Sequence, residues 1–322
     1  MISNDLDIAK GWIDLADPRL GTQVVFANDD FFADKSRLIQ REEPVFIVGK
    51  YDDHGKWMDG WESRRRRVPG HDHCVIKLGR PALIRGFEID TRFFTGNYPP
   101  AASIDVCVSD DVIPPDSAWR PLVPRTDLKG DSRLAVPAHT DTPVTHVRLN
   151  IFPDGGVARL RIYGQIVGDF ATGAEIDLAA MVNGALPVVT NNEHFGKLAF
   201  MLQPGRSVNM GDGWETRRRR EPGHDWAIVR LAATGTIDRF LVDTNHFKGN
   251  YPDRCSIQGA PDGADLADAE NWPLLLAEQK LAADTEHFFE KEILPHAPVR
   301  TLRLNIFPDG GIARLRAFGR VA

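Results

Sequence analysis

Short strings in which apolar and polar residues alternate recur along this 322-residue chain, and Gly, Pro or Asp bounds most of them. A period of two is typical of strands with one buried face, and the bounding residues are typical of turns. The pattern therefore predicts half-buried β-strands in both halves of the chain. The predicted strands are residues 75–78, 83–90, 144–151, 228–231, 237–243 and 299–306.

Helical periodicity is sparse, and residues 30–40 and 267–284 are the better candidates for helix. Many short strands and turns within about 150 residues favour a jelly-roll β-sandwich over a parallel sheet with crossover helices. The sequence therefore predicts an all-β protein.

The second half of the chain repeats the first. Residues 13–16 recur as 176–179, and residues 148–161 recur as 303–316 with one change, Val157 to Ile312. Residues 48–56 have no counterpart in the second copy. Such a long duplication predicts one domain per copy. We expect a first domain at 1–167 and a second at 168–322, joined near 165–175.

The longest polar repeat runs from Trp61 to Asp72 and returns from Trp214 to Asp225, with ten of twelve positions identical. It contains a Glu, four Arg, a His and an Asp around a Pro-Gly turn. Core packing tolerates much apolar substitution and needs no such polar identity. The block therefore predicts a polar functional site, and the alternative is an exposed, charge-rich strand.

Charge and cysteine content exclude several classes of protein. The net charge of -6 provides no overall positive field for nucleic acid or an anionic membrane. The three cysteines lack CxxC spacing, so we expect a reducing compartment. No apolar run approaches the roughly twenty residues of a membrane span, and the first residues do not form a signal peptide. These features predict a cytoplasmic protein without a membrane partner.

Several separated motifs resemble those of the allantoicase (allantoate amidinohydrolase) family, and the resemblance extends from about Trp12 to Phe318. The motifs are residues 28–33, 55–65, 69–72, 93–99 and 150–156. The resemblance implies two tandem jelly-roll, galactose-binding-like domains. It also implies hydrolysis of allantoate to ureidoglycolate and urea in purine degradation.

The residues of the polar repeat suit that implied reaction. A guanidinium fork can hold the substrate carboxylate, and alternate residues of an extended Arg run face one way. These residues are Arg64, Arg66, Arg217 and Arg219. An acid and a base must move protons at the departing ureido nitrogen and at water. The candidates are Glu62, His71, Asp72, Glu215, His224 and Asp225. The alternative is that Glu62 and Asp72 pair with the Arg run and leave His71 at the surface.

The closing Phe-Pro-Asp-Gly-Gly motif, at 152–156 and 307–311, has the residue order of a tight turn in which Gly takes positive φ. A turn alone does not require the polar residues beside it, so these are second-tier candidates for substrate binding. They are Arg148, Asn150, Asp154, Arg303, Asn305 and Asp309, together with Asn97 and Asn250 of the two Gly-Asn-Tyr-Pro segments.

The two copies differ at positions that bear on catalysis. Phe31 and Phe93 of the first copy become His194 and His246 in the second. With His224, these imidazoles could form a base cluster or bind a divalent metal, and the alternative is three separate surface histidines. We therefore favour the second copy slightly and include His246 among the catalytic candidates, while no cofactor is certain.

The rival function is a tandem carbohydrate-binding module, because the jelly-roll fold also serves that role. A sugar-binding module would present aromatic platforms on its loops. The repeated blocks carry Arg, Glu, His and Asp instead, which favours a small anionic substrate. We also expect a homo-oligomer.

Overall fold

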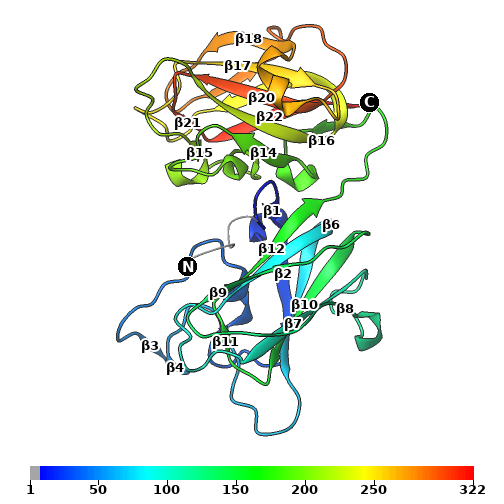
Figure 1. The fold of residues 1–322 in the computed structure, drawn as a ribbon, viewed down its shortest axis with the longest axis vertical. Helices are drawn as coiled ribbons and strands as arrows, with labels where there is room; N and C mark the ends of the chain where they lie inside the picture. Colours follow the sequence, from blue (N-terminus) through cyan, green and yellow to red (C-terminus); the bar gives the residue numbers. More distant parts are fainter. Residues whose placement is uncertain (1–7) are drawn as a thin grey trace. The chain divides into compact units, whose positions relative to one another are not determined.

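The computed structural model describes residues 8–322, which form two compact units divided between Val167 and Gly168. These units are the two repeats, and each is built almost entirely of antiparallel β-strands (Figure 1). The prediction of an all-β protein with two tandem jelly-roll sandwiches is confirmed.

The first repeat is organised around its long central strand, β6 (Asp72–Asp90). The amino-terminal part of β6 pairs with β2 and β10, and its carboxy-terminal part pairs with β9 and β12. Strand β6 thereby contributes to both layers of the sandwich. The other strands are β1 (Ile13–Asp14), β2 (Gln23–Ala27), β3 (Tyr51–Asp52), β4 (Gly55–Lys56), β5 (Trp61–Glu62), β7 (Ala101–Cys107), β8 (Arg120–Asp127), β9 (Arg133–Pro137), β10 (Val144–Phe152), β11 (Gly156–Val157) and β12 (Arg159–Ile166).

The second repeat has the same arrangement around β16 (Asp225–Asp243). Strands β14 and β20 pair with one part of β16, and β19 and β22 pair with the other. Its strands besides β16 are β13 (Glu175–Asp177), β14 (Leu186–Thr190), β15 (Trp214–Glu215), β17 (Arg254–Ala260), β18 (Leu274–Lys280), β19 (Glu286–Phe289), β20 (Val299–Phe307), β21 (Gly311–Ile312) and β22 (Arg314–Val321).

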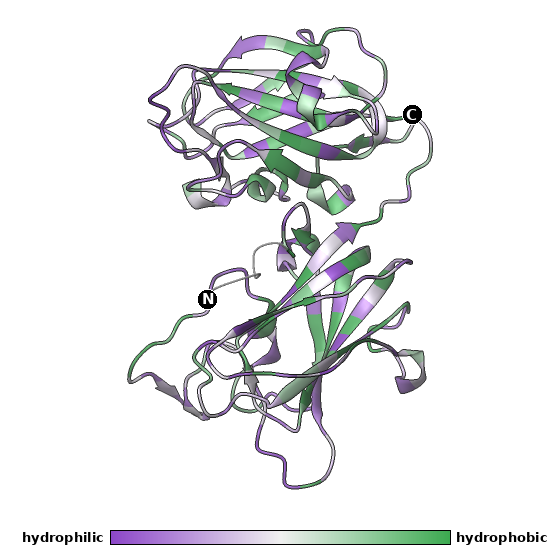
Figure 2. Cartoon of the chain, in the orientation of Figure 1, coloured by the Kyte–Doolittle hydropathy of each residue, from purple (hydrophilic) through white to green (hydrophobic). Residues whose placement is uncertain are grey.

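Alternation along the strands produces the two cores. On β10, Val147, Leu149 and Ile151 are fully buried, and polar residues lie between them. Figure 2 shows the same mixture of apolar and polar residues along the strands of both repeats. All six predicted ranges are strand, but they lie on four strands, because 75–78 and 83–90 belong to β6 and 228–231 and 237–243 belong to β16.

Helical structure within residues 8–322 is limited to short 3₁₀ helices. They are η1 (Pro18–Leu20), η2 (Lys35–Ile39), η3 (Asp116–Ala118), η4 (Met181–Asn183), η5 (Leu198–Leu202), η6 (Met210–Asp212) and η7 (Leu266–Asn271). Of the predicted helix at 30–40, only the 3₁₀ helix η2 is present. The predicted helix at 267–284 is wrong beyond η7, because Pro273 is followed by β18, whose Leu275 and Leu276 pack into the core. No helix in the described part of the chain is long and apolar enough to span a membrane.

The insertion that distinguishes the first repeat folds as a small hairpin. Strands β3 and β4 pair through Tyr51 with Lys56 and Asp52 with Gly55. Between η5 and β15 the second repeat has η6 but no strand among its described residues. The hairpin is therefore a local addition to one copy of a duplicated fold.

Candidate active site

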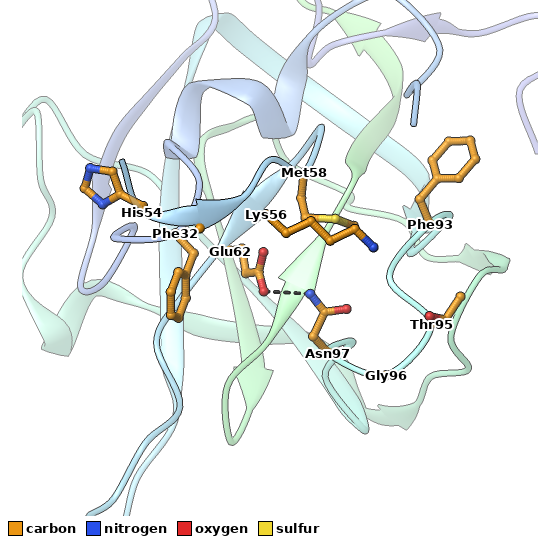
Figure 3. Close-up of a pocket in the computed structure, with 10 residues that line it drawn as sticks. Phe32, His54, Lys56, Met58, Glu62, Phe93, Thr95, Gly96 and Asn97 are labelled. Carbon is orange, nitrogen blue, oxygen red and sulfur yellow. Dashed lines mark hydrogen bonds between the residues drawn. The ribbon is translucent and has the colours of Figure 1, made fainter. Parts of the chain in front are cut away.

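The first repeat contains a cavity of about 380 Å³ at the end of its sandwich where β5, the β3–β4 hairpin and the loop after β6 meet. Figure 3 shows the side chains around this cavity. The lining residues are Phe32, His54, Gly55, Lys56, Met58, Glu62, Phe93, Thr95, Gly96 and Asn97. They come from three separated segments of the first repeat, and the hairpin supplies three of them.

Glu62 is the buried acid of this pocket. Strand β5 holds it by pairing Glu62 with Gly156, while the neighbouring Trp61 is fully buried and donates its indole N–H to the Asp29 carbonyl at 2.8 Å. Burial raises the pKa of the Glu62 carboxyl, although the hydrogen bond from Asn97 and the charge of Lys56 act in the opposite direction. A carboxyl group with a raised pKa at a pocket wall is suited to proton transfer.

Asn97 lies directly against Glu62. Its Nδ2 donates to Glu62 Oε1 at 2.6 Å, the contact drawn as a dashed line in Figure 3. This hydrogen bond fixes one carboxyl oxygen of Glu62. The two sequence candidates Glu62 and Asn97 are therefore brought together.

The Phe-Pro-Asp-Gly-Gly turn holds the loop that carries Asn97. Gly156 N donates to the Asn97 carbonyl at 2.7 Å. Gly155 has a φ of 138°, and a Cβ at this position would lie 2.8 Å from the Asn97 carbonyl oxygen. Asp154 accepts a hydrogen bond from Arg66 N at 2.9 Å. The motif is thus a turn, as its residue order predicts, and it also positions a pocket residue.

Lys56 supplies the positive charge among the ten residues lining the pocket. Its Nζ lies 4.5 Å from the centre of the Phe46 ring, which is a cation–π contact. Its charge also favours the ionised form of Glu62. The pocket thus combines a cation, a carboxyl group and an amide.

The second repeat keeps only part of this arrangement. Asn250 Nδ2 donates to Glu215 Oε1 at 2.5 Å, which reproduces the Asn97–Glu62 pair, and it also lies 3.9 Å from Met210 Sδ. His246, at the position of Phe93, has its Nε2 3.0 Å from the Ser207 carbonyl oxygen. Because no hairpin matches β3–β4, this pair has no counterpart of Lys56 in sequence.

Buried carboxylates hold two of the candidate arginines. Arg66 Nη1 lies 2.5 Å from Asp72 Oδ1, and Arg219 Nη1 lies 2.8 Å from Asp225 Oδ1. The exposed fractions of Asp72 and Asp225 are 1% and 0%, so neither carboxylate faces solvent. Asp309 repeats the contact of Asp154 by accepting from Arg219 N at 2.8 Å. These residues brace the loop between β5 and β6, or β15 and β16, rather than lining the pocket.

The first arginines of the two runs, Arg64 and Arg217, have different partners. Arg64 Nε donates to Asp29 Oδ2 at 2.7 Å and is therefore paired. Arg217 faces Asn192 at the position of Asp29 and lines a separate cavity in the second repeat. Neither side chain is among those lining the Glu62 pocket.

The two candidate histidines lie against aromatic rings. The ring centres of His71 and Phe152 are 4.7 Å apart, and those of His224 and Phe307 are also 4.7 Å apart. His224 Nε2 is 3.2 Å from Asn305 Oδ1. Neither histidine lines the Glu62 pocket, so the structure separates them from the carboxyl group with which sequence reasoning grouped them.

Arg148 and Arg303 lie on the strands β10 and β20. Arg148 Nη2 is 2.9 Å from Asp105 Oδ2, and its Nη1 is 3.1 Å from Asp116 Oδ1. Arg303 is paired in register with Gln258 and lies 5.0 Å from the centre of the Trp226 ring. Burial lowers the pKa of Arg303. Both arginines are structural parts of a sheet in this arrangement.

The three histidines considered as metal ligands have different neighbours. His194 contacts Phe195 with ring centres 4.5 Å apart, while His224 and His246 contact Asn305 and Ser207. Within residues 8–322, no group of three or more His, Cys, Asp or Glu side chains is arranged to hold a metal ion.

Sequence reasoning did not assign several of the pocket residues to a site. These are Phe32, His54, Lys56, Met58, Phe93 and Thr95. The available signal was the position of the unmatched segment 48–56, which immediately precedes the repeated Trp-Glu block. An insertion beside a polar motif in one copy alone marks a place where the two copies differ in sequence and local structure.

The fold and the pocket define a tandem β-sandwich protein with a small polar site around a buried carboxyl group, as in acid–base enzymes. A family model described as the allantoicase repeat matches residues 13–167 and 176–322, and the chain belongs to the allantoicase family. The resemblance found in the motifs is therefore confirmed.

Similarity to known relatives extends over nearly the whole chain. The chain is 56% identical to a probable allantoicase 2 of Burkholderia pseudomallei, covering 97% of this chain and 96% of the relative. It is 52% identical to a probable allantoicase of Pseudomonas aeruginosa, covering 96% of each. The crystal structure of Saccharomyces cerevisiae allantoicase matches with a TM-score of 0.81 at 36% identity, covering 96% of this chain and 93% of that one.

Proposed function

We propose that the chain hydrolyses allantoate to ureidoglycolate and urea in the first-repeat pocket around Glu62. As a member of the allantoicase family, the chain is a hydrolase of purine degradation, and a carbohydrate-binding module is not favoured. The observation that supports this place for the reaction is the group Glu62, Asn97 and Lys56 at one cavity.

The pocket suits a small anion with amide groups. Its volume of about 380 Å³ lies near the lower end of the range for ligand sites, roughly 300–1,000 Å³. Allantoate carries one carboxylate and two ureido groups on a single carbon atom. In our proposal the Lys56 ammonium binds the carboxylate and the Asn97 amide oxygen accepts from a ureido N–H. Phe32, Met58 and Phe93 add apolar surface to the walls of the pocket.

Glu62 moves the proton in this proposal. Its protonated form donates to the departing ureido nitrogen while the bond between that nitrogen and the central carbon breaks, and urea leaves. The Glu62 carboxylate then takes a proton from water as the water oxygen bonds to the same carbon, which gives ureidoglycolate. Glu62 is thereby returned to its protonated state, so protons balance over the cycle.

The remaining site candidates take supporting roles. Arg66, Asp72 and Asp154 brace the loop beside the pocket, and Arg219, Asp225 and Asp309 do the same in the second repeat. The second-copy imidazoles favoured that copy on sequence grounds. Because Lys56 belongs to a hairpin that only the first copy carries, we now place catalysis in the first copy.

Three further expectations accompany this proposal. The buried, unpaired cysteines Cys74, Cys107 and Cys255 support a cytoplasmic location. A homo-oligomer is tested by light scattering of the purified protein. The divalent metal stays a prediction, and loss of urea release with a chelator, restored by added cation, would establish it.

The direct test is urea release from allantoate by the purified chain, with simple sugars titrated in parallel. We expect urea formation well above the spontaneous rate and no binding of sugars. Urea release at the spontaneous rate would contradict the activity, whereas full activity in Glu62→Gln would contradict only the site.

A further inference from the structure

The second repeat contains a cavity that the proposed reaction does not use. It has a volume of about 490 Å³ and is lined by Asn192, Arg217, Arg218, Arg219, Arg220 and Glu221. These residues belong to the loop between β15 and β16 and to the segment after β14. Four consecutive arginines therefore border one hollow of the surface.

Comparison of the two repeats shows that the carboxylate beside the first arginine of the run is replaced in the second repeat, while Glu221, which lines the cavity, stands where the first repeat has Val68. In the first repeat, Asp29 accepts from both the backbone N–H and the Nε of Arg64, at 3.1 and 2.7 Å. The equivalent residue of the second repeat is Asn192. Its Oδ1 still accepts from Arg217 N at 3.2 Å, so the backbone contact is kept. A neutral amide cannot neutralise the Arg217 side chain.

The positive charge at the cavity is incompletely balanced. Arg219 is held by Asp225, yet its Nε is buried without a hydrogen-bond partner. Among residues 8–322, the guanidinium groups of Arg217, Arg218 and Arg220 have no hydrogen bond or ion pair. Like charges held close together repel each other, and a bound anion relieves that repulsion.

Gly223 keeps this arrangement in place. It has a φ of 120°, and a Cβ there would lie 3.0 Å from Arg219 Nη2. The Pro222-Gly223 turn therefore passes close over the Arg219 side chain, which is fixed by Asp225 on the other side. Arg219 therefore gives the cavity one fixed positive charge, whose attraction for an anion costs little conformational entropy.

We propose that this cavity is an anion site, separate from the catalytic pocket, that takes one small oxyanion through the unpaired fork of Arg217. Carboxylate and phosphate share the required chemistry, since both offer two oxygens to a planar guanidinium. The reaction's substrate and product both carry carboxylates, and inorganic phosphate is the other source. The site exists because the second repeat has an amide where the first has Asp29.

The test is calorimetric titration of the full-length protein with inorganic phosphate and, separately, with malonate at constant ionic strength. Arg217→Gln removes the free fork, and Asn192→Asp restores the partner that Arg64 has in the first repeat. Arg64→Gln is the matched control, because Arg64 is already paired. Thermal melting of each variant checks that the fold is intact. Asn192 also contacts Asp225, so Asn192→Asp can destabilise the protein. If it does, the result for Arg217→Gln decides the outcome.

We expect one anion to bind per chain. Its dissociation constant should rise about tenfold or more in Arg217→Gln and in Asn192→Asp, and should be unchanged in Arg64→Gln. The anion that binds more tightly identifies the source. Equal binding in the wild type and Arg217→Gln would overturn the proposal, as would the absence of binding for both anions. The titration does not depend on urea release, so its failure is distinct from failure of the proposed function.

Discussion

Glu62 and Glu215 have the same neighbour, an asparagine amide, but different surroundings. Only Glu62 shares a cavity with a lysine from the β3–β4 hairpin. We expect Glu62→Gln to lower kcat by roughly a hundredfold or more, a loss typical of a proton-transfer group. Glu215→Gln should have a much smaller effect. Steady-state urea release measures both, and equal losses would show that the second repeat also takes part.

The raised pKa of Glu62 gives the sign of a pH effect. Burial raises the folded-state pKa above the ordinary value of 4.5, so between 4.5 and that raised value the folded state binds more protons than the unfolded state. The free energy of unfolding should therefore fall as pH rises through this window. Denaturant melts at several pH values should show this contribution in the wild type and not in Glu62→Gln. The same slope in both proteins would assign it to other groups.

Lys56 is the residue to which we assign the substrate carboxylate. Lys56→Met keeps most of the side-chain volume but removes the charge, so KM should rise about tenfold or more through loss of a charge-assisted hydrogen bond. Lys50→Met is the control, because Lys50 Nζ lies 3.6 Å from the centre of the Trp57 ring and does not line the pocket. A similar rise in KM for both variants would point to a general effect of surface charge.

At the level of elements, the period of two predicted the long strands β6, β10, β16 and β20, and the duplication predicted two similar sandwiches. The prediction of a helix at 267–284 was wrong because Leu275 and Leu276 complete a core against β17. The local sequence pattern does not contain this tertiary contact. Only some of the pocket residues could be predicted from the sequence. Glu62 and Asn97 belong to repeated motifs, whereas Lys56 belongs to the unmatched hairpin and joins them only through folding.

The turn at Gly155 holds the loop that carries Asn97, and a substitution in the turn can test this role. Alanine at positive φ costs roughly 1–3 kcal/mol wherever it stands. Gly155→Ala should carry this cost and also displace Asn97, because its Cβ would meet backbone atoms of residues 97–99 at 2.7–2.9 Å. Gly263→Ala, with a φ of 78° and no atom within 4 Å of its Cβ, is the matched control.

Activity separates the two effects of these substitutions. Both variants should lose some stability in thermal melts, but only Gly155→Ala should also lower kcat. Normal kcat in a folded Gly155→Ala would mean that the turn does not position Asn97.

At the scale of the whole molecule, all ten pocket residues lie in the first repeat, and the exposed segment 167–173 joins this repeat to the second. A site for a sequence-specific protease placed between Gly168 and Asp169 allows the chain to be cut without altering either core. We expect two fragments of similar size, each melting cooperatively, and urea release that stays with the fragment containing Glu62. The uncut protein with the inserted site is the control for the insertion itself. Loss of activity on cutting, with both fragments still folded, would mean that the second repeat completes the catalytic site. The hairpin with Lys56 would then be insufficient to explain why catalysis takes place in the first copy.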